Sequence, residues 1–459
     1  MSDEASGHSP DPVAKADTPA KAGTPAAADT PAQADAPPGA NLTGREPGGR
    51  NPLRGLGRAI LDSVLEGSST VTTLLAILTA LVIGALVIAF SNTGVLHNWN
   101  AFFAAPGTAI SSAWQAIASA YSAMFEGAIF NPHTIAAAFN GSGSVGAIFY
   151  PLSETAAQAT PLVLTGLAVA LAFRAGLFNI GGASQWIGGA IITTYLGFAV
   201  SLPPVIHVIV CLAGGFAGGA VMGWLVGALK ARTGAHEVIV TIMINYVMYN
   251  LLSYLLGTPT ALQLPHQANL ISPGIASDAT LPHVGGPPPQ VGVGFLIAVA
   301  AAAGMWWLLA RSTTGFQFRT VGANPNAART AGMSVERTWV LAMLLAGGLA
   351  GLSGAVATQG QFYSLNIQSY GTYGTDGITV ALLGRAKPLG VVLSALLFGA
   401  LEAGGTVMEA ATTVPSDIVE VIEGLIVLFV AAPLMIRAVF RLRSAQSTGL
   451  EAVSKGWNG

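Results

Sequence analysis

Residues 315–337, GFQFRTVGANPNAARTAGMSVER, lie between two apolar segments, residues 291–310 and 339–358, that are each long enough to cross a bilayer. The stretch is polar and basic. Its arginines are Arg319, Arg329 and Arg337, with Arg311 just before it. A basic connection of this kind is typical of the cytoplasmic side of a membrane protein. The sequence therefore predicts two membrane-spanning helices joined by a cytoplasmic loop.

A short helix is predicted inside this loop. Asn324 suits the N-cap, Pro325 suits the first helical position, and Gly332 suits the C′ position beyond the last turn. The helix would cover residues 325–331, about two turns. Its small side chains, which we expect on the surface, are Ala327, Ala328 and Ala331. A capped basic helix with an alanine face favours docking of a partner, and an ordinary positively charged loop is the alternative.

The composition is that of a polytopic helical membrane protein. Of 459 residues, 52% are hydrophobic and 9% are charged, whereas soluble domains carry about 25% charged residues. The single cysteine, Cys211, excludes an intrachain disulfide and a cysteine metal site, and we expect neither a metal nor a cofactor. No G-x-x-x-x-G-K-[ST] loop occurs, so ATP hydrolysis by that route is not expected. The lipid bilayer is therefore an expected partner of the chain.

The distribution of large apolar residues divides the chain into three regions. Residues 1–52 are rich in Ala, Pro, Thr and Asp and lack the side chains of a core, which predicts a disordered cytoplasmic tail. Residues 53–443 hold the apolar segments and are predicted to form a transmembrane domain. Residues 444–459 are predicted to be a cytoplasmic C-terminal tail.

Apolar runs predict an all-α fold with about ten membrane spans. The eighth run, residues 377–384, is too short for an ordinary span and is predicted to be broken, tilted or re-entrant. Residues 114–130, in a long segment before the second span, are predicted to form either an interfacial helix or a short dip into the bilayer. The predicted spans are residues 70–90, 153–173, 181–200, 204–229, 238–256, 291–310, 339–358, 377–384, 389–405 and 418–436.

Clusters of lysine and arginine set the predicted orientation. The clusters at residues 45–58 and 437–443 place both termini in the cytoplasm, and the cluster at residues 311–337 places the basic loop there too. By this plan residues 92–150 and 258–290 lie outside, either as a docking surface for a partner or as plain linkers. The chain is therefore predicted to be a multi-pass membrane protein with both termini inside.

Glycines recur within the apolar segments at spacings that let helices approach closely. Residues 214–219, GGFAGG, contain overlapping pairs of small residues four apart, and Gly347 and Gly351 form another such pair. The GGFAGG stretch does not suit a nucleotide-binding loop, because no strand precedes it. We therefore predict that these glycines serve helix packing.

Residues 174–189, RAGLFNIGGASQWIGG, place polar side chains between two apolar segments. Asn179 and Gln185, with Gly181 and Gly182, indicate an unwound joint at membrane depth. Irregular backbone is tolerated there only beside protein or a water-lined cavity. The joint is predicted either to line a solute pathway or to be a simple turn.

Residues 236–250, HEVIVTIMINYVMYN, carry a polar and aromatic stripe. Asn245 and Tyr249 are four residues apart, as are Tyr246 and Asn250, so the stripe follows one side of a helix. An unpaired buried amide costs about 1–3 kcal/mol, and we therefore expect the stripe to face protein or water. It serves either interhelical hydrogen bonds or a path for a polar, planar solute.

Asp376 lies within residues 370–390, YGTYGTDGITVALLGRAKPLG, ahead of a half-length apolar helix. A carboxylate inside a membrane is by default a candidate for function. Asp376 is predicted to cap the helix that follows it or, alternatively, to meet solute at an outer gate.

Four of these segments resemble one family, in the same order along the chain. Residues 322–333 resemble the pattern G-x-N-x-x-A-A-R-x-x-G-[MI] of ABC importer permeases in the branched-chain amino acid, ribose and nucleoside group. The other three are similar to F-N-I-G-x-E-G-Q, N-E-V-I-x-T-x-M-x-N-Y and G-x-D-G-I-A-V-A-L-L-G-x-x-x-P-x-G of the nucleoside members, with guanosine-type uptake permeases most similar. The chain departs at Ala183 and Ser184, which replace Glu and Gly, and at His236, which replaces Asn. Any role that this glutamate has in the family therefore does not apply to this chain.

The resemblance implies a permease subunit of an ATP-driven importer in a bacterial cytoplasmic membrane. Such a subunit is a transport protein for a small solute and not an enzyme, and no nucleic acid is expected as a partner. The implied partners are a separate ATPase subunit, a second and non-identical permease subunit, and an extracytoplasmic solute-binding lipoprotein. The implied solute is a nucleoside, with a ribose-like sugar or a branched-chain amino acid as alternatives. An ion-coupled secondary transporter is the alternative of another class.

Two groups of residues are assigned on this basis. The basic loop would insert into a groove of the ATPase through Asn324, Pro325, Asn326, Ala327, Ala328, Arg329 and Gly332. The predicted translocation path comprises Asn179, Gln185, Asn245, Tyr246, Tyr249, Asn250 and Asp376.

Overall fold

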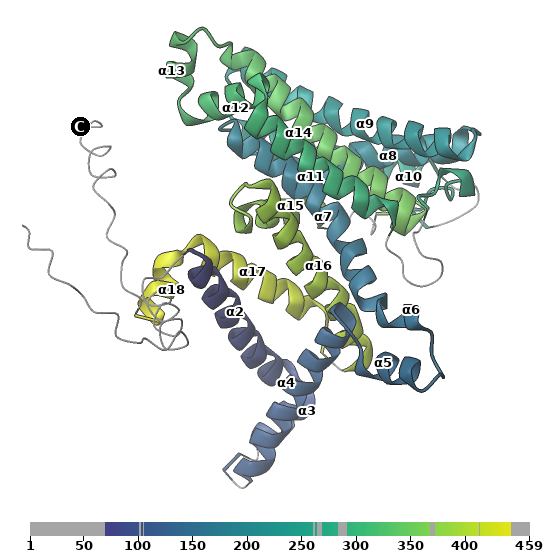
Figure 1. The fold of residues 1–459 in the computed structure, drawn as a ribbon, viewed down its shortest axis with the longest axis vertical. Helices are drawn as coiled ribbons and strands as arrows, with labels where there is room; N and C mark the ends of the chain where they lie inside the picture. Colours follow the sequence, from purple (N-terminus) through teal and green to yellow (C-terminus); the bar gives the residue numbers. More distant parts are fainter. Residues whose placement is uncertain are drawn as a thin grey trace, which may run out of the picture. The chain divides into compact units, whose positions relative to one another are not determined.

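The structure is a computed structural model in which the regular elements of the described residues are helices (Figure 1). It describes residues 69–100, 102–103, 105–259, 262–263, 269–282, 292–367, 372–412 and 414–441. The tails predicted at residues 1–52 and 444–459 lie outside these ranges.

Two groups of elements follow along the chain. The first comprises α2 (Ser69–Ser91), α3 (Thr93–Asn100), α4 (Pro106–Ala128), α5 (Pro132–Phe139), α6 (Val145–Ile148), α7 (Tyr150–Arg174), α8 (Gly182–Ala199), α9 (Pro204–Thr233) and α10 (Glu237–Gly257). After the short η1 (Ser277–Ala279) come α11 (Val293–Arg311), α12 (Thr313–Ala323), α13 (Pro325–Thr330), α14 (Val335–Ala357), η2 (Thr358–Phe362), α15 (Tyr373–Leu383), α16 (Pro388–Ala411), α17 (Asp417–Ala431) and α18 (Pro433–Val439).

The apolar helices confirm a polytopic all-α membrane fold. Among the described residues, 7 helices are long and apolar enough to cross a membrane, or 8 if α17 and α18, which meet at 90°, form one span. The predicted spans at residues 181–200 and 377–384 correspond to α8, with 18 residues, and α15, with 11, and neither is among those helices. The short eighth element is thus present, and the total of about ten spans stays a prediction.

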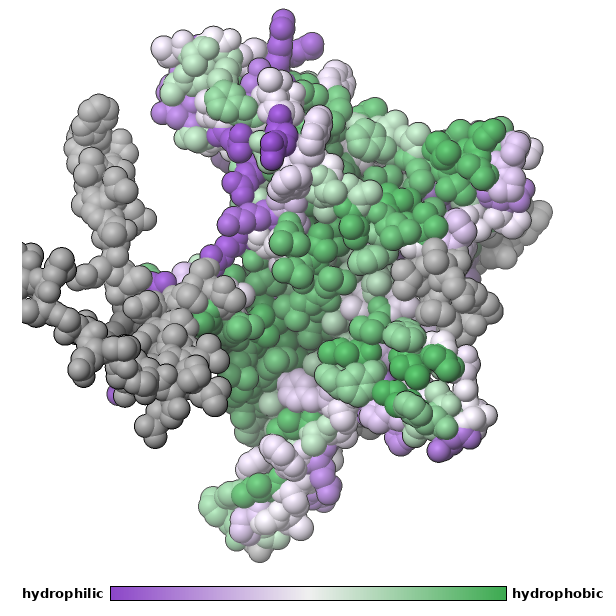
Figure 2. Space-filling view, in the orientation of Figure 1, coloured by the Kyte–Doolittle hydropathy of each residue, from purple (hydrophilic) through white to green (hydrophobic). Residues whose placement is uncertain are grey.

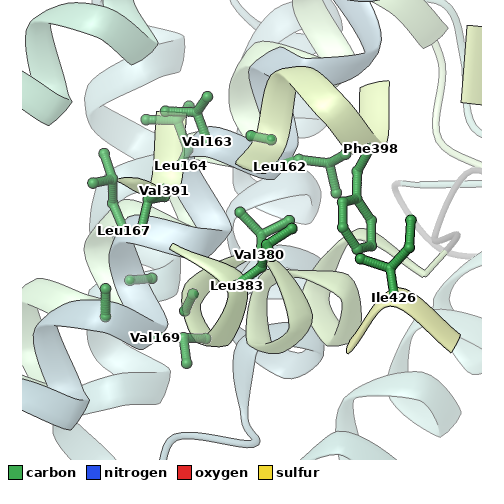
Figure 3. Packing of buried hydrophobic residues seen from close by; sticks show 14 of the residues in the cluster. Leu162, Val163, Leu164, Leu167, Val169, Val380, Leu383, Val391, Phe398 and Ile426 are labelled. Atoms are coloured by element: carbon green, nitrogen blue, oxygen red, sulfur yellow. The ribbon is translucent and has the colours of Figure 1, made fainter. Parts of the chain in front are cut away.

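Helix α7 is the buried centre around which α11, α14, α15 and α16 pack. In its most apolar stretch 83% of the residues are buried. Figure 3 shows its side chains beside Val380 of α15 and Val391 of α16, whose methyl groups would come within 3 Å of a Cβ placed on Gly166. Because lipid tails are as apolar as these side chains, this close van der Waals packing stabilises the bundle more than apolar burial does.

Helices α8, α9 and α14 lie side by side and approach each other through glycines (Figure 1). A Cβ on Gly219 of α9 would lie 2.2 Å from the carbonyl oxygen of Gly347, and one on Gly189 of α8 would lie 2.2 Å from that of Gly351. No side chain larger than hydrogen fits at these contacts. The packing role predicted for the glycines of α9 and α14 is therefore confirmed.

Of the stretch 114–130, residues 114–128 belong to helix α4, which packs along α16 and also contacts α2. The two helices meet at Gly404, where a Cβ would lie 2.3 Å from the carbonyl oxygen of Met124. Figure 2 shows apolar side chains over much of the helical surface and hydrophilic ones around α12 and α13. The polar loop that the sequence singled out is thus a polar surface feature of the folded chain.

Candidate functional site

The short helix predicted from its capping residues is present as α13. Asn324 Oδ1 accepts hydrogen bonds from the backbone N–H groups of Asn326 and Ala327, both at 3.0 Å, and Pro325 occupies the first position. At the other end Gly332 has a φ of +81° and its N–H donates to the Arg329 carbonyl at 3.0 Å. These contacts confirm the N-cap, the proline and the C′ glycine, and the helix ends one residue earlier than predicted.

The expected alanine surface of α13 is wrong in one position. Ala328 is fully buried and packs with Val321 of α12 and Val335 of α14, with Met333 and Trp339 against them. A helix of this length keeps its place only by burying one side, and Ala328 is the residue that faces inward. The exposed residues among those assigned to docking are Asn324, Pro325, Asn326, Ala327, Arg329 and Gly332.

A glycine contact mounts α12 on the end of α7. A Cβ on Gly322 would lie 2.3 Å from the carbonyl oxygen of Arg174, and Gly176, with a φ of +72°, lies directly against Gly322. On the other side Arg174 Nε donates to the carbonyl of Ala386 at 3.0 Å. The segment α12–α13 is therefore in backbone contact with the buried central helix.

The turn between α15 and α16, which contains Ala386, has an uncommon backbone. Arg385 and Ala386 have φ values of +54° and +49°, in the left-handed region that residues with a Cβ seldom adopt. The Arg174 side chain holds this turn. Sequence reasoning missed it, because only neighbouring structure makes two successive non-glycine residues adopt that conformation.

Asn179 and Gln185 form a closed pair at the joint between α7 and α8. Asn179 Nδ2 donates to Gln185 Oε1 at 2.9 Å, and Gln185 Nε2 donates to Asn179 Oδ1 at 3.1 Å. Both side chains are fully buried. The non-helical joint is as expected, but these amides satisfy each other and do not reach the exposed surface that carries Tyr246.

Asn245 attaches α10 to the beginning of α8. Its Nδ2 donates to the carbonyl of Ile180 at 2.9 Å, and its Oδ1 accepts from the N–H of Ser184 at 3.0 Å. Ser184 lies in the first turn of α8, where backbone N–H groups have no partner within the helix. Asn245 thus makes the interhelical hydrogen bonds that were one alternative for the stripe.

The rest of the stripe faces outward from α10. Tyr246 is 64% exposed and Tyr249 is 40% exposed, and Asn250 is exposed beside them. A cavity of about 380 Å³ is lined by Ile242, Asn245, Tyr246 and Tyr249. Hydroxyl and amide groups are unfavourable towards lipid, so this face is suited to protein, water or a solute.

Asp376 does not cap α15, and that prediction is wrong. The helix begins at Tyr373 after Thr372, so Asp376 lies inside its first turn. The carboxylate accepts a hydrogen bond from the Thr372 hydroxyl, and the Asp376 N–H donates to the Thr372 carbonyl at 2.9 Å. The two tyrosines and Asn250 are therefore grouped on α10, and Asp376 stands on a separate element.

Tyr373, which sequence reasoning did not select, joins α15 to α7 and α8. Its ring stacks on Trp186 with centroids 6.4 Å apart, and its hydroxyl donates to Gln158 Oε1 at 3.1 Å. The two tyrosines of the sequence Y-G-T-Y, residues 370–373, are the signal that could have pointed to this contact. Among the described residues, no group of three His, Cys, Asp or Glu side chains could hold a metal ion.

The family profile described as "Branched-chain amino acid transport system / permease component" matches residues 151–431, more than half of the chain. The chain belongs to this permease family. The match covers α7 to α17, and hence the joint, the stripe and the capped loop. The permease is accordingly a multi-pass transport component.

Three curated relatives are similar to this permease over most of their length. The guanosine ABC transporter permease protein NupP of Bacillus subtilis is 38% identical over 65% of this chain and 85% of its own. The glucose ABC transporter permease protein TsgB13 of Haloferax volcanii is 35% identical over 61% and 76%. The nucleoside ABC transporter permease protein NupB of Lactococcus lactis is 33% identical over 66% and 85%. No solved structure matches the chain.

Proposed function

We propose that this permease is the membrane subunit of an ATP-driven importer that carries nucleosides into a bacterial cell across the cytoplasmic membrane. Two of the relatives named above are guanosine or nucleoside permeases. The observation that carries the proposal is the exposed stripe of Tyr246, Tyr249 and Asn250 on α10. A nucleoside has a flat base and a hydroxylated ribose, and an aromatic face and an amide suit these two parts.

One proposed partner is another permease subunit that is not identical to this one. The stripe on α10 faces away from the rest of this chain. One subunit alone therefore lines only one side of a solute path. A second subunit opposite α10 would enclose the solute and keep the polar side chains away from lipid. Asn179 and Gln185 support this surface indirectly, because their pair fixes the joint to which Asn245 is bonded.

The proposed ATPase contact is the exposed side of α13. A solute-binding lipoprotein would deliver solute on the opposite side of the membrane, with both termini of the permease in the cytoplasm. Displacement of α13 would reach the buried bundle through the contact of Gly322 with Gly176. ATP hydrolysis then takes place in the separate subunit, and this chain supplies the solute path and the helix that transmits the movement.

Two alternatives remain distinct from this proposal. The similarity to TsgB13, a glucose permease protein, favours a simple sugar as the second candidate. A branched-chain amino acid is less suited, because its ammonium and carboxylate would need charged partners and the described stripe residues of α10 are neutral. An ion-coupled transporter would need no capped α13 helix.

Uptake into proteoliposomes that contain the permease with its ATPase and receptor tests the proposal. Guanosine and adenosine should compete with each other, whereas glucose, ribose and leucine should not. Tyr246→Ala should lower nucleoside uptake about two- to tenfold. This factor corresponds to the loss of one contact between aromatic rings, which is worth about 0.5–1.5 kcal/mol. Tyr254→Ala is the matched control, since Tyr254 is 60% exposed on the same helix and outside the cavity. Transport of glucose or leucine without nucleoside competition would reject the nucleoside assignment.

A further inference from the structure

An ion pair closes the turn between α9 and α10. Lys230 Nζ lies 2.6 Å from Glu237 Oε2, and the two side chains are only 18% and 11% exposed. Lys230 lies in the last turn of α9 and Glu237 is the first residue of α10, with Gly234 in the left-handed conformation between them. The pair therefore joins two helices through charges that are largely withdrawn from solvent.

The same lysine also contacts α14, at a residue that packs beside α13. Its ammonium lies 4.9 Å from the centroid of the Trp339 ring in α14. Trp339 packs against the small cluster of Val321, Ala328 and Val335 that holds α13 in place. Lys230 thus lies between the carboxylate of α10 and the aromatic ring that supports α13.

Helix α10 packs on α8 through Met248, Leu252 and Leu256. Only 22% of the residues in its most apolar stretch are buried, against 67% for α14. Its middle is held by Asn245 at the beginning of α8, and its first residue is held by Lys230. By contrast, α9 and α14 touch through the backbones of Gly219, Gly223 and Gly347. The end of α9 that carries Lys230 is therefore fixed to α14, and Lys230 joins the first residue of α10 to that end.

We propose that Lys230 is a positioning residue for transport, which links α10 to the α13 segment by contacting the Glu237 carboxylate and the Trp339 ring at once. The inference rests on the proposed function, because it assigns the route by which the docked helix moves the solute-facing stripe. A largely desolvated ion pair resists separation, since parting the charges would lose the attraction that offsets their desolvation. A cation–π contact is likewise stronger when water is excluded. Because of these two contacts, a displacement of Trp339 also displaces Glu237.

The decisive readout is the number of solute molecules transported per ATP hydrolysed, measured on the whole complex in proteoliposomes. Lys230→Gln should lower this ratio about fivefold or more, the size of a typical coupling between two sites. ATPase association and hydrolysis without solute should be unchanged. Lys230→Arg, which keeps the charge and the ring contact, should retain most of the ratio.

Arg232→Gln is the matched control. Arg232 lies in the same last turn of α9, is exposed, and carries the same charge. Its removal should leave the transport ratio unchanged. Exchange of the charges in Lys230→Glu with Glu237→Lys should recover part of the ion pair but not the contact with Trp339, and it should give an intermediate ratio.

Two results would overturn the inference. One is an unchanged ratio in Lys230→Gln. The other is a loss of membrane abundance and ATPase association with a normal ratio in the remaining complex, which would make the ion pair purely structural. If Lys230→Gln does not reach the membrane, Trp339→Leu gives the same test with the ion pair intact. Failure of the proposed function is separate, because it would appear in the unaltered permease as absent nucleoside uptake.

Discussion

Helices α14 and α10 are both apolar enough to cross a membrane, yet they are packed in opposite ways. In α14 67% of the most apolar stretch is buried, and glycines bring its backbone against α8 and α9. In α10 only 22% is buried, and large side chains such as Ile239, Met243 and Tyr246 are exposed on it. The difference indicates that α14 belongs to a stiff body, whereas α10 presents a surface for something outside this chain.

Residue size explains the difference. Small residues let two helices approach until backbone atoms touch, which leaves no space for water or solute and fixes their relative position. Large residues on an open face cannot pack that closely and leave a surface with pockets, such as the cavity beside Tyr246 and Tyr249. A transporter needs both kinds of helix, because a force is transmitted by a stiff element and a solute is met by an open one.

The largest expected effect is a side chain forced between α9 and α14. Gly219→Val would place a Cβ 2.2 Å from the Gly347 carbonyl oxygen and further methyl groups beyond it. Overpacking of a close contact costs about 1–3 kcal/mol, and more where backbone must move. We expect little folded permease in the membrane, measured by abundance and thermal unfolding. Gly304→Ala in α11, where nothing lies within 4 Å, should be tolerated. Normal folding of Gly219→Val would show that the two helices are not rigidly joined.

The same contrast occurs between two adjacent alanines of α13. Ala327 is exposed and Ala328 is fully buried. Ala327→Glu should therefore leave the loop folded and weaken ATPase association about tenfold or more, which corresponds to about 1.4 kcal/mol. Ala328→Glu should instead unfold the segment. Association is measured by co-purification at equal membrane abundance, with Gln317→Glu, an equal added charge on an exposed residue of α12, as control. Unimpaired association in Ala327→Glu would remove α13 from the docking surface.

Local chemistry made part of this predictable from sequence. Asn324, Pro325 and Gly332 define the ends of α13 through backbone requirements that hold in any context. The glycine spacing of α9 and α14 likewise predicts close approach wherever two such helices meet. These features need no knowledge of the rest of the fold.

Features that depend on a partner element could not be read in this way. Ala328 is buried because Val321 and Val335 happen to lie beside it. The amides of Asn179 and Gln185 would suit either a solute path or a hydrogen bond to each other. Only the geometry shows that they bond to each other. Asp376 suits a cap by residue type, but α15 begins earlier, at Tyr373.

The smallest expected effect compares two asparagines on α10. Asn245 is bonded to Ile180 and Ser184 of the neighbouring joint and helix, whereas Asn250 is exposed and its Nδ2 donates at 2.7 Å to the Tyr246 carbonyl of its own helix. Asn245→Ala should destabilise the permease by about 1–3 kcal/mol, since it leaves the Ile180 carbonyl and the Ser184 N–H without their partner. Thermal unfolding in detergent measures this change.

Asn250→Ala should lower stability by less than about 0.5 kcal/mol, because an exposed hydrogen bond is readily replaced by water. Its effect should instead fall on nucleoside uptake at low solute concentration, as expected for a group that meets the solute. Asn245→Ala should lower uptake at all concentrations, since a loosened α10 is displaced whether or not solute is bound. If both variants changed only stability, α10 would be an ordinary structural helix with an exposed face. If both changed only uptake, the hydrogen bonds of Asn245 would not anchor α10, and the contrast with α14 would no longer rest on packing.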